Sequence, residues 1–251
     1  MEFDGKVVIV TGSTSGNGEH TAIKFAENGA KVVITGRNEQ RMQNVVKRCD
    51  EVSPKGYKAF GVIADITKEE DCERLINSTV EHYGKLDILV NNAGCAPFGP
   101  LEDPKLLSYL DETINVNIRP TVRLSLLAIP HLVATKGNIV NMSSFGAKKP
   151  AASMLPLCTT DAAREMITRV MALELGQKGV RVNCVRPGFI KTPVYEAYGF
   201  SFEELMKSVK QPLQKLGSPL DVAHCILFLA SEKSSFITGS CLTTDGGILN
   251  V

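Results

Sequence analysis

The sequence predicts a single α/β domain in which one parallel sheet is covered by helices on both faces. Three observations predict it. Short apolar runs rich in β-branched residues alternate with longer helical patterns along all 251 residues, as expected for strands buried on both faces. Every connection between two runs is long enough for a helix, and a glycine-rich segment follows the first run. Together these features are typical of the doubly wound, Rossmann-type fold.

The predicted strands are seven short segments. They span residues 6–12, 31–36, 58–65, 86–94, 137–144, 180–188 and, as the seventh candidate, 240–247. Between the first two strands, an apolar stripe predicts a helix that ends at Gly29; the stripe consists of Ala22, Ile23, Phe25 and Ala26. The other long helices are expected at about residues 38–52, 67–84, 103–134 and 155–178.

No linker, low-complexity tract or repeat interrupts this alternation, which predicts one dinucleotide-binding domain over residues 1–251. The least regular part is residues 188–220, where prolines and glycines break up two short helical patches. A long irregular insertion after a strand end is where a lid over a ligand usually lies. We therefore predict a substrate loop or lid there.

The net charge and the first apolar run indicate which kinds of partner and which location to expect. The chain has 28 basic and 27 acidic residues, evenly spread, and a net charge of +1. This balance gives no electrostatic footprint for nucleic acid or for an anionic membrane, so a small molecule or a protein is the expected partner. The first apolar run, within "MEFDGKVVIVTGS", is too short for a signal peptide or a membrane span. A cytoplasmic location is expected.

The cysteines and histidines predict no metal site and no disulfide framework. The seven cysteines are scattered without CxxC or Cys/His ligand spacing, and the four histidines are far apart in the sequence. Reduced, mostly buried thiols are the expectation, since a free cysteine packs as a small apolar side chain.

The segment "TGSTSGNG", residues 11–18, has the context of a phosphate-binding loop, because it follows the first strand and opens the first helix. Gly12 permits a tight turn, Gly16 lets the backbone approach a pyrophosphate, and Gly18 allows close helix packing. Free N–H groups at the start of the helix then face the anion. Alone, glycines after a strand can also be mere turn formers.

The end of the second strand predicts which dinucleotide binds. An acidic residue there would bind the 2′-hydroxyl of NAD, but this strand ends "ITGRN", and its first charged residue is Arg37. A guanidinium suits the 2′-phosphate of NADP, because its planar fork matches phosphate geometry. The sequence therefore favours NADP(H) over NAD(H). The alternative is that Arg37 is a solvated surface residue.

Taken together, these motifs resemble those of the short-chain dehydrogenase/reductase family. The resemblance covers essentially the whole chain and rests on "TGSTSGNG", "NNAG" at 91–94, "INVNI" at 114–118, "NMSS" at 141–144, "VRVNCVRPGFIKTP" at 180–193 and "FLASEKSSFITGSCLTTDGG" near the C-terminus. It implies that Asp65 and Asn91 line the adenine side of the cofactor. The full set of cofactor-binding positions that it implies is Gly12, Ser13, Ser15, Gly16, Asn17, Gly18, Arg37, Asp65, Ile66, Asn91, Ala93, Gly94, Pro187, Gly188, Ile190 and Thr192.

The same resemblance implies a catalytic set that this chain carries only in part. Asn117 matches the family's helical asparagine and Ser144 its serine after the fifth strand. The family's Tyr-x-x-x-Lys pair begins thirteen residues after that serine, and here the two positions hold Leu157 and Asp161. The flanking segments keep the family's spacing, so the alignment of these two positions with the family's Tyr and Lys is not shifted. Asn17 is a second departure, since the family usually has an aliphatic residue there.

Leucine supplies no proton, and general acid catalysis contributes about 10²–10⁴-fold to such reactions. Three interpretations follow. The chain could bind cofactor without carbonyl or alcohol chemistry, as a pseudoenzyme. It could be an active oxidoreductase that recruits Tyr195 or Tyr198 as proton donor, together with Ser144 and Asn117. It could also be an interaction protein that no longer binds nucleotide.

Replacement of a lysine by Asp161 also reverses the local charge, which predicts that NADP⁺ binds more favourably relative to NADPH than in ordinary members. Arg164 could pair with Asp161 and mute this effect, or it could face solvent. The segment "VYEAYGFSFEELM" is compatible with a hydrophobic ligand but equally with a self-packed lid. Members of the family usually associate through the two long helices, which implies a homo-oligomer, either a dimer or a tetramer.

Overall fold

The computed structural model describes residues 1–199 and 201–251, apart from the side chains of residues 205, 206 and 208. Its centre is a seven-stranded parallel sheet in the order β3-β2-β1-β4-β5-β6-β7, which confirms the predicted fold class. The strands are β1 (Val7–Val10), β2 (Lys31–Gly36), β3 (Phe60–Ile63), β4 (Ile88–Asn91), β5 (Asn138–Met142), β6 (Arg181–Pro187) and β7 (Cys241–Thr244).

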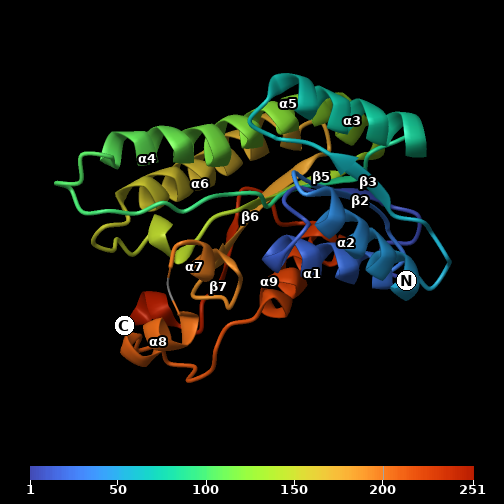
Figure 1. Ribbon diagram of the computed structural model, residues 1–251. Coiled ribbons are helices and arrows are strands. Elements are labelled where there is room, and N and C mark those ends of the chain that lie inside the picture. Colours follow the sequence, from blue (N-terminus) through green and yellow to red (C-terminus); the bar gives the residue numbers. More distant parts are fainter. Residues whose placement is uncertain (200) are drawn as a thin grey trace.

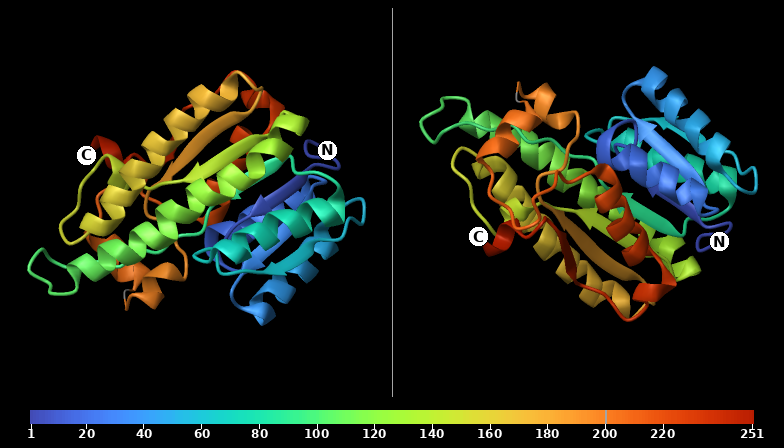
Figure 2. Two further views of the ribbon diagram at one scale, coloured as in Figure 1. Left: turned by 90° about the horizontal axis from the view of Figure 1, so that it is seen from above. Right: turned by 90° about the horizontal axis from the view of Figure 1, so that it is seen from below.

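Helices cover both faces of the sheet (Figure 1). One face carries α1 (Gly16–Glu27), α2 (Glu39–Val52) and α9 (Pro219–Ala230), and the other carries α3 (Glu69–Tyr83), α4 (Leu106–Thr113), α5 (Arg119–Thr135) and α6 (Leu155–Gly176). Seen from above, α5 and α6 run side by side along one face, and seen from below, α9 lies beside α1 (Figure 2). The strand order reverses between β1 and β4, and such a reversal opens a crevice at the carboxyl ends of the strands.

The single long helix expected at residues 103–134 is interrupted. A π-helical turn, η1 (Ile114–Ile118), separates α4 from α5. The side chain of Asn117 in this turn is buried and hydrogen-bonded to the backbone of the loop after β4. This contact gives a physical reason for the irregular turn, and π turns are frequent at functional sites.

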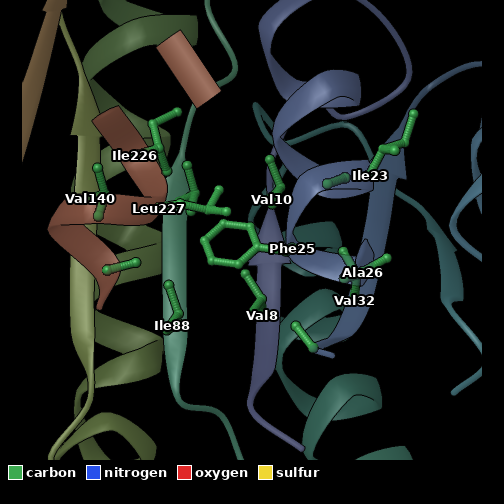
Figure 3. Packing of buried hydrophobic residues seen from close by; sticks show 14 of the residues in the cluster. Val8, Val10, Ile23, Phe25, Ala26, Val32, Ile88, Val140, Ile226 and Leu227 are labelled. Atoms are coloured by element: carbon green, nitrogen blue, oxygen red, sulfur yellow. The ribbon is translucent and has the colours of Figure 1, made fainter. Parts of the chain in front are cut away.

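Two apolar clusters hold the layers together, one on each face of the sheet. Figure 3 shows Phe25 of α1 packed between Val8, Val10 and Ile88 of the central strands, with Ile226 and Leu227 of α9 beside it. On the opposite face, residues of β1, β4 and β5 pack against α3, α5 and α6. Because β1 and β4 are buried on both faces, the sheet ends that carry the polar loops are held rigidly.

The insertion at residues 188–220 contains the two predicted short helical patches, α7 (Val194–Ala197) and α8 (Phe202–Ser208). They lie near the C-terminus, at the same end of the sheet as the loops after β4 and β6 (Figure 1). The remaining elements are short 3-10 turns: η2 (Phe145–Ala147), η3 (Glu232–Ser234) and η4 (Ile248–Asn250). In the described part of the chain, no helix is both long and apolar enough to cross a membrane.

Candidate active site

A cavity of about 430 Å³ opens at the crevice between β1 and β4. The parallel register pairs Val10 with Val90, which brings the loop after β1 against the loop after β4. Ten of the predicted cofactor positions line this cavity: Gly12, Ser15, Gly16, Asn17, Arg37, Asp65, Ile66, Ala93, Gly94 and Thr192. The structure therefore brings together residues that are far apart in the sequence.

Two glycines of the first loop are required by close backbone approach. Gly12 has φ +62°, and a Cβ there would lie 3.0 Å from Ala93 Cα. At Gly18 a Cβ would lie 2.4 Å from the carbonyl oxygen of Gly12. A side chain at either position would push the loop away from α1 or from the loop after β4. These glycines thus keep the cradle open for a phosphate at the start of a helix.

The other six predicted cofactor positions lie outside the lining of this cavity. Ser13 is buried, and its hydroxyl accepts a hydrogen bond from the Thr35 backbone N–H. Asn91 is also buried and donates to Asn141 Oδ1 at 2.9 Å. Both tie neighbouring strands together beneath the cavity. The remaining four are Gly18, packed under the first loop, and Pro187, Gly188 and Ile190, at the end of β6.

The polar residues at the rim fit a dinucleotide. Arg37 is exposed beside the end of β2, and within the described residues its guanidinium has no carboxylate partner. Asn17 lines the same cavity, and its Oδ1 is buried with no hydrogen-bond partner among the described residues. An orphaned amide oxygen needs a donor, so it suits a hydroxyl or amide group of a ligand rather than a phosphate. Both observations fit a nucleotide bound in this cavity.

A second, mostly apolar cavity of about 680 Å³ adjoins the first, and Val194 lines both. Aromatic pairs build its walls: Phe145 packs on Phe189 with ring centroids 4.7 Å apart, and Phe98 meets Tyr198 edge-on. Ser144 and Leu157 also line it. A cavity of this size with few polar groups is typical of a site for an apolar small molecule.

Leu157 and Asp161 do not point into this cavity together. Leu157 is half-buried and contributes to the apolar wall, whereas Asp161 is 1% exposed and lies behind Ser144. The Ser144 hydroxyl donates a hydrogen bond to Asp161 Oδ2 at 2.7 Å. Burial raises the pKa of Asp161 from 3.8 to about 6, against the opposing effects of Arg164 and the Ser144 hydrogen bond.

The expectation that Arg164 faces solvent is wrong. Its side chain is buried, with Nη1 lying 3.7 Å from Asp161 Oδ1. Arg164 Nε donates to the Asn117 carbonyl at 2.8 Å, and Nη2 donates to the Ala93 carbonyl at 2.7 Å. A Cβ at Gly94 would lie 3.5 Å from Nη1, so the guanidinium underlies the loop that lines the first cavity. A cation is therefore present in the site, supplied one helical turn after Asp161.

Asn117 links the π-helical turn to the loop after β4. Its Oδ1 accepts from the Cys95 backbone N–H at 2.9 Å, and its Nδ2 donates to the Cys95 carbonyl at 3.0 Å. Nδ2 also contacts Thr160 Oγ1 on α6 at 3.3 Å. Since both ends of the amide are engaged, Asn117 positions the loop between the two cavities.

Tyr195 and Tyr198 both line the apolar cavity. The Tyr198 hydroxyl oxygen accepts a hydrogen bond from the Ala96 backbone N–H at 3.0 Å. Burial raises the pKa of Tyr195 to about 12 and also raises the pKa of Tyr198. A raised phenol pKa makes both side chains weaker acids than an ordinary tyrosine.

Sequence reasoning missed several residues that shape the first cavity. Thr14 and Asn92 line it, and Asn92 Nδ2 donates to the Thr11 carbonyl at 2.8 Å. At Gly36, a Cβ would lie 2.7 Å from Thr14 Cγ2, so this glycine lets the first loop approach β2. Thr14 and Asn92 stand inside the quoted motifs, which was the available signal. Val116 of η1 likewise stands inside the quoted motif at 114–118, whereas Glu112 of α4 lies in none of the quoted motifs.

Comparison with known proteins places the chain among oxidoreductases. A family model described as enoyl-(acyl carrier protein) reductase matches residues 12–249. A subunit of (2S)-[(R)-hydroxy(phenyl)methyl]succinyl-CoA dehydrogenase from Thauera aromatica is 38% identical over 248 residues, which are 98% of each chain. L-fucose dehydrogenase from Bos taurus is 35% identical over 98% of this chain and 90% of its own length.

Solved structures share the architecture. A 7α-hydroxysteroid dehydrogenase complexed with NADH and 7-oxo glycochenodeoxycholic acid superposes with a TM-score of 0.90 at 33% identity, over 98% of this chain and 95% of the other. A Caenorhabditis elegans short-chain dehydrogenase/reductase of unknown function, solved with its cofactor, gives 0.90 at 36% identity, over 100% and 97%.

Proposed function

The chain belongs to the short-chain dehydrogenase/reductase family, and from that premise we propose that it binds NADP(H) beside a hydrophobic small molecule but is impaired in the family's carbonyl/alcohol hydride transfer. The single observation that carries this proposal is a cavity lined by ten of the expected cofactor positions, next to an apolar cavity whose wall holds Leu157 where the family has its proton donor. The cofactor, when bound, supplies or accepts the hydride.

Cofactor binding is supported by the cradle and its charges. Gly18 keeps the start of α1 close to the first loop, and Gly12 keeps this loop close to the loop after β4. The start of α1 offers free N–H groups to a pyrophosphate. Arg37 stands at the end of β2 without an acidic partner among the described residues. A guanidinium there attracts a 2′-phosphate, which favours NADP(H) over NAD(H).

Impaired chemistry is supported by the position of Leu157. The oxygen of a carbonyl ligand becomes negative as hydride arrives, and a leucine side chain can neither donate a proton nor hydrogen-bond to it. General acid catalysis contributes about 10²–10⁴-fold, which corresponds to roughly 3–5 kcal/mol of barrier. Tyr195 and Tyr198 replace this function poorly, because burial raises the pKa of each phenol.

The experiment is a spectrophotometric screen of NADPH and NADP⁺ turnover with carbonyls and alcohols. The structure shows that Leu157→Tyr/Asp161→Lys alone would place a lysine against the buried Arg164. The triple variant Leu157→Tyr/Asp161→Lys/Arg164→Leu removes that repulsion, although it also removes the donors to the Ala93 and Asn117 carbonyl oxygens, and should raise turnover by up to about 10²–10⁴-fold. Leu155→Tyr, on the same helix but outside the apolar cavity, is the matched control.

The outcomes separate the candidate functions. Low turnover in the native chain with recovery in the triple variant supports the proposal. Full turnover in the native chain, abolished by Tyr195→Phe or Tyr198→Phe, would establish the active oxidoreductase with a recruited donor. If calorimetry detected no binding of NADP(H) or NAD(H), the remaining interpretation would be an interaction protein that no longer binds nucleotide.

We also propose that the chain forms homo-oligomers through α5 and α6. Met166, Val170 and Leu173 follow each other at helical spacing on α6, and their side chains are 55%, 47% and 76% exposed. Leu126 on the neighbouring α5 is 59% exposed. Figure 2 shows the two helices lying side by side. An exposed apolar stripe along two adjacent helices is typical of a self-complementary subunit contact.

A further inference from the structure

Ser144 and Asp161 form a hydrogen-bonded pair that Leu157 leaves facing the apolar cavity. Ser144 Oγ lines the cavity, accepts from the Gly146 backbone N–H at 3.1 Å and donates to Asp161 Oδ2 at 2.7 Å. Asp161 itself is 1% exposed and is separated from the cavity by Ser144. A hydroxyl has one hydrogen and two lone pairs. Ser144 therefore presents its hydrogen to a ligand only when Asp161 does not accept that hydrogen, and otherwise it presents a lone pair.

We propose that Asp161 holds the proton of this site and acts through Ser144, so that its protonation state decides whether the apolar cavity binds and reduces a carbonyl or binds a hydroxyl. With Asp161 protonated, its O–H donates to Ser144 Oγ, and the Ser144 hydrogen turns to the cavity. With Asp161 ionised, the Ser144 hydrogen points to Asp161, and only a lone pair is left for the ligand. This inference deepens the proposed function, because it names the slower proton route that remains where Leu157 cannot donate a proton, and it rests on the proposed function for the binding of the cofactor.

The groups around Asp161 allow both states. On its own helix, Arg164 lies 3.7 Å from Oδ1 and favours the carboxylate. Glu165, the next acidic side chain on α6, disfavours it, although Arg186 of β6 pairs with Glu165 through two hydrogen bonds, at 2.6 and 2.8 Å. Ser143, before η2, donates to the Asp161 backbone carbonyl at 3.3 Å. Three further titratable groups lie around these partners: Lys148 toward Glu165, and Cys95 and Cys184 toward Arg164.

Burial is the largest of these influences, and it raises the pKa of Asp161 to about 6. A carboxyl group with this pKa gains and loses its proton close to neutral pH, where a proton-transfer group works best. The tuning comes from the location behind Ser144, since the apolar cavity wall keeps water from the carboxyl group.

The reduction balances without a further reagent. A bound NADPH would supply the hydride, with its two electrons, to the carbonyl carbon, and the C=O π electrons would move onto the oxygen. That oxygen takes the proton of the Ser144 hydroxyl, while Ser144 Oγ takes the proton of Asp161. The products would be the alcohol, NADP⁺ and the Asp161 carboxylate beside Arg164, and the carboxylate would recover a proton from solvent through the Ser144 hydroxyl after the alcohol has left the cavity. Activity by this route falls as the pH rises past the Asp161 pKa.

The first test uses the whole chain without cofactor. Infrared difference spectra follow the C=O stretch of protonated carboxyl groups between about pH 4 and pH 8. We expect a component that titrates at about pH 6, is absent in Asp161→Asn and moves to higher pH in Ser144→Ala, because the Ser144 hydrogen bond stabilises the carboxylate. Asp103→Asn removes an aspartate from the wall of the same cavity and should leave it unchanged. If the titration of this component had its midpoint below about pH 5, or did not shift in Ser144→Ala, the proposal that Asp161 acts through Ser144 would be overturned.

The second test measures ligand polarity by equilibrium dialysis with 2-acetylnaphthalene and 1-(2-naphthyl)ethanol. The affinity ratio of ketone to alcohol should fall about fivefold or more between pH 5 and pH 8, the value of one hydrogen bond. In Asp161→Asn and Ser144→Ala the ratio should stay constant. A ratio that is constant in the native chain, or that changes equally in all three, would overturn the inference. Failure of cofactor binding, seen by calorimetry, would overturn the proposed function but would leave both of these tests intact.

Discussion

The Arg164 guanidinium and the Asp161 carboxylate form an ion pair inside the candidate active site, with 3.7 Å between Nη1 and Oδ1 and both side chains almost fully buried. The family resemblance implied a cation at position 161, and here the cation comes from one turn later on α6. Because Arg164 also holds the carbonyl oxygens of Ala93 and Asn117, the exchange changes the electrostatics of the site without leaving a buried charge alone.

Removal of Arg164 should therefore lower the free energy of unfolding, and a second substitution, at Asp161, should restore part of the loss. Arg164→Met leaves Asp161 without its partner, and we expect a loss of about 3–5 kcal/mol in the free energy of unfolding at pH 8. Arg164→Met/Asp161→Leu should recover part of it, because no buried carboxylate is then left unpaired, whereas the Ala93 and Asn117 carbonyl oxygens lack the guanidinium in both variants. Urea denaturation measures both. Arg169→Met, on the same helix but 39% exposed, is the control and should change little; equal losses in the single and double variants would contradict a coupled pair.

The raised pKa of Asp161 should make the free energy of unfolding depend on pH. Its pKa in the folded protein, about 6, lies above the ordinary value of 3.8, so the folded state binds the proton more tightly than the unfolded state. The contribution of Asp161 to the free energy of unfolding is fully present below about pH 4. It falls by about 3 kcal/mol as the pH rises through 6. Denaturant titrations at a series of pH values should show this slope in the native chain and a flatter one in Asp161→Asn. Parallel curves would show that another group titrates.

The two redox forms of the cofactor should respond differently to the same ionisation. NADP⁺ carries a positive nicotinamide ring, so an ionised Asp161 favours it over NADPH, while the neighbouring Arg164 limits the effect. We expect the ratio of the NADPH to the NADP⁺ dissociation constant to rise about five- to tenfold between pH 5 and pH 8. The 2′-phosphate titrates in the same range, but it is common to both forms and cancels in the ratio. Calorimetry on Asp161→Asn should give a constant ratio, and a ratio that falls with pH would exclude this electrostatic account.

Arg37 should set the preference between dinucleotides. Arg37→Ala removes the cation at the rim of the first cavity and should weaken NADPH binding by about 1.5–3 kcal/mol, the value of a hydrogen bond to a charged group, with little change for NADH. Arg41→Ala, exposed on the adjacent α2, serves as the control. Equal effects on NADPH and NADH would mean that Arg37 does not contact the 2′-phosphate.

The sequence predicted the sheet well because the strands are buried on both faces. Runs such as residues 6–12 and 86–94 are apolar throughout, and this signal depends on local composition alone. The interruption of the long helix at η1 was not predictable in this way. It depends on the contact of Asn117 with the backbone of Cys95, 22 residues earlier in the chain.

The site was predictable as a set of positions but not as a set of contacts. Leu157 and Asp161 are four residues apart on α6, a spacing that places two side chains on one face of a helix. Helical spacing sets only an approximate direction, and the hydrogen bond to Ser144 turns Asp161 behind the cavity wall. The burial of Arg164 likewise follows from two carbonyl oxygens that reach α6 from elsewhere in the chain, one in the loop after β4 and one in the π-helical turn η1.

Assembly through α5 and α6 gives the last prediction. Leu173 is the most exposed residue of the apolar stripe on α6, at 76%, so Leu173→Glu would place a charge inside the proposed subunit contact at little cost to the folded subunit, within about 0.5 kcal/mol. We expect sedimentation velocity to show dimers or tetramers for the native chain and monomers for the variant. Leu101→Glu, equally exposed in the loop before α4, is the matched control and should leave the oligomer intact. A native chain that sediments as a monomer at micromolar concentration would show that the stripe does not bind a second copy.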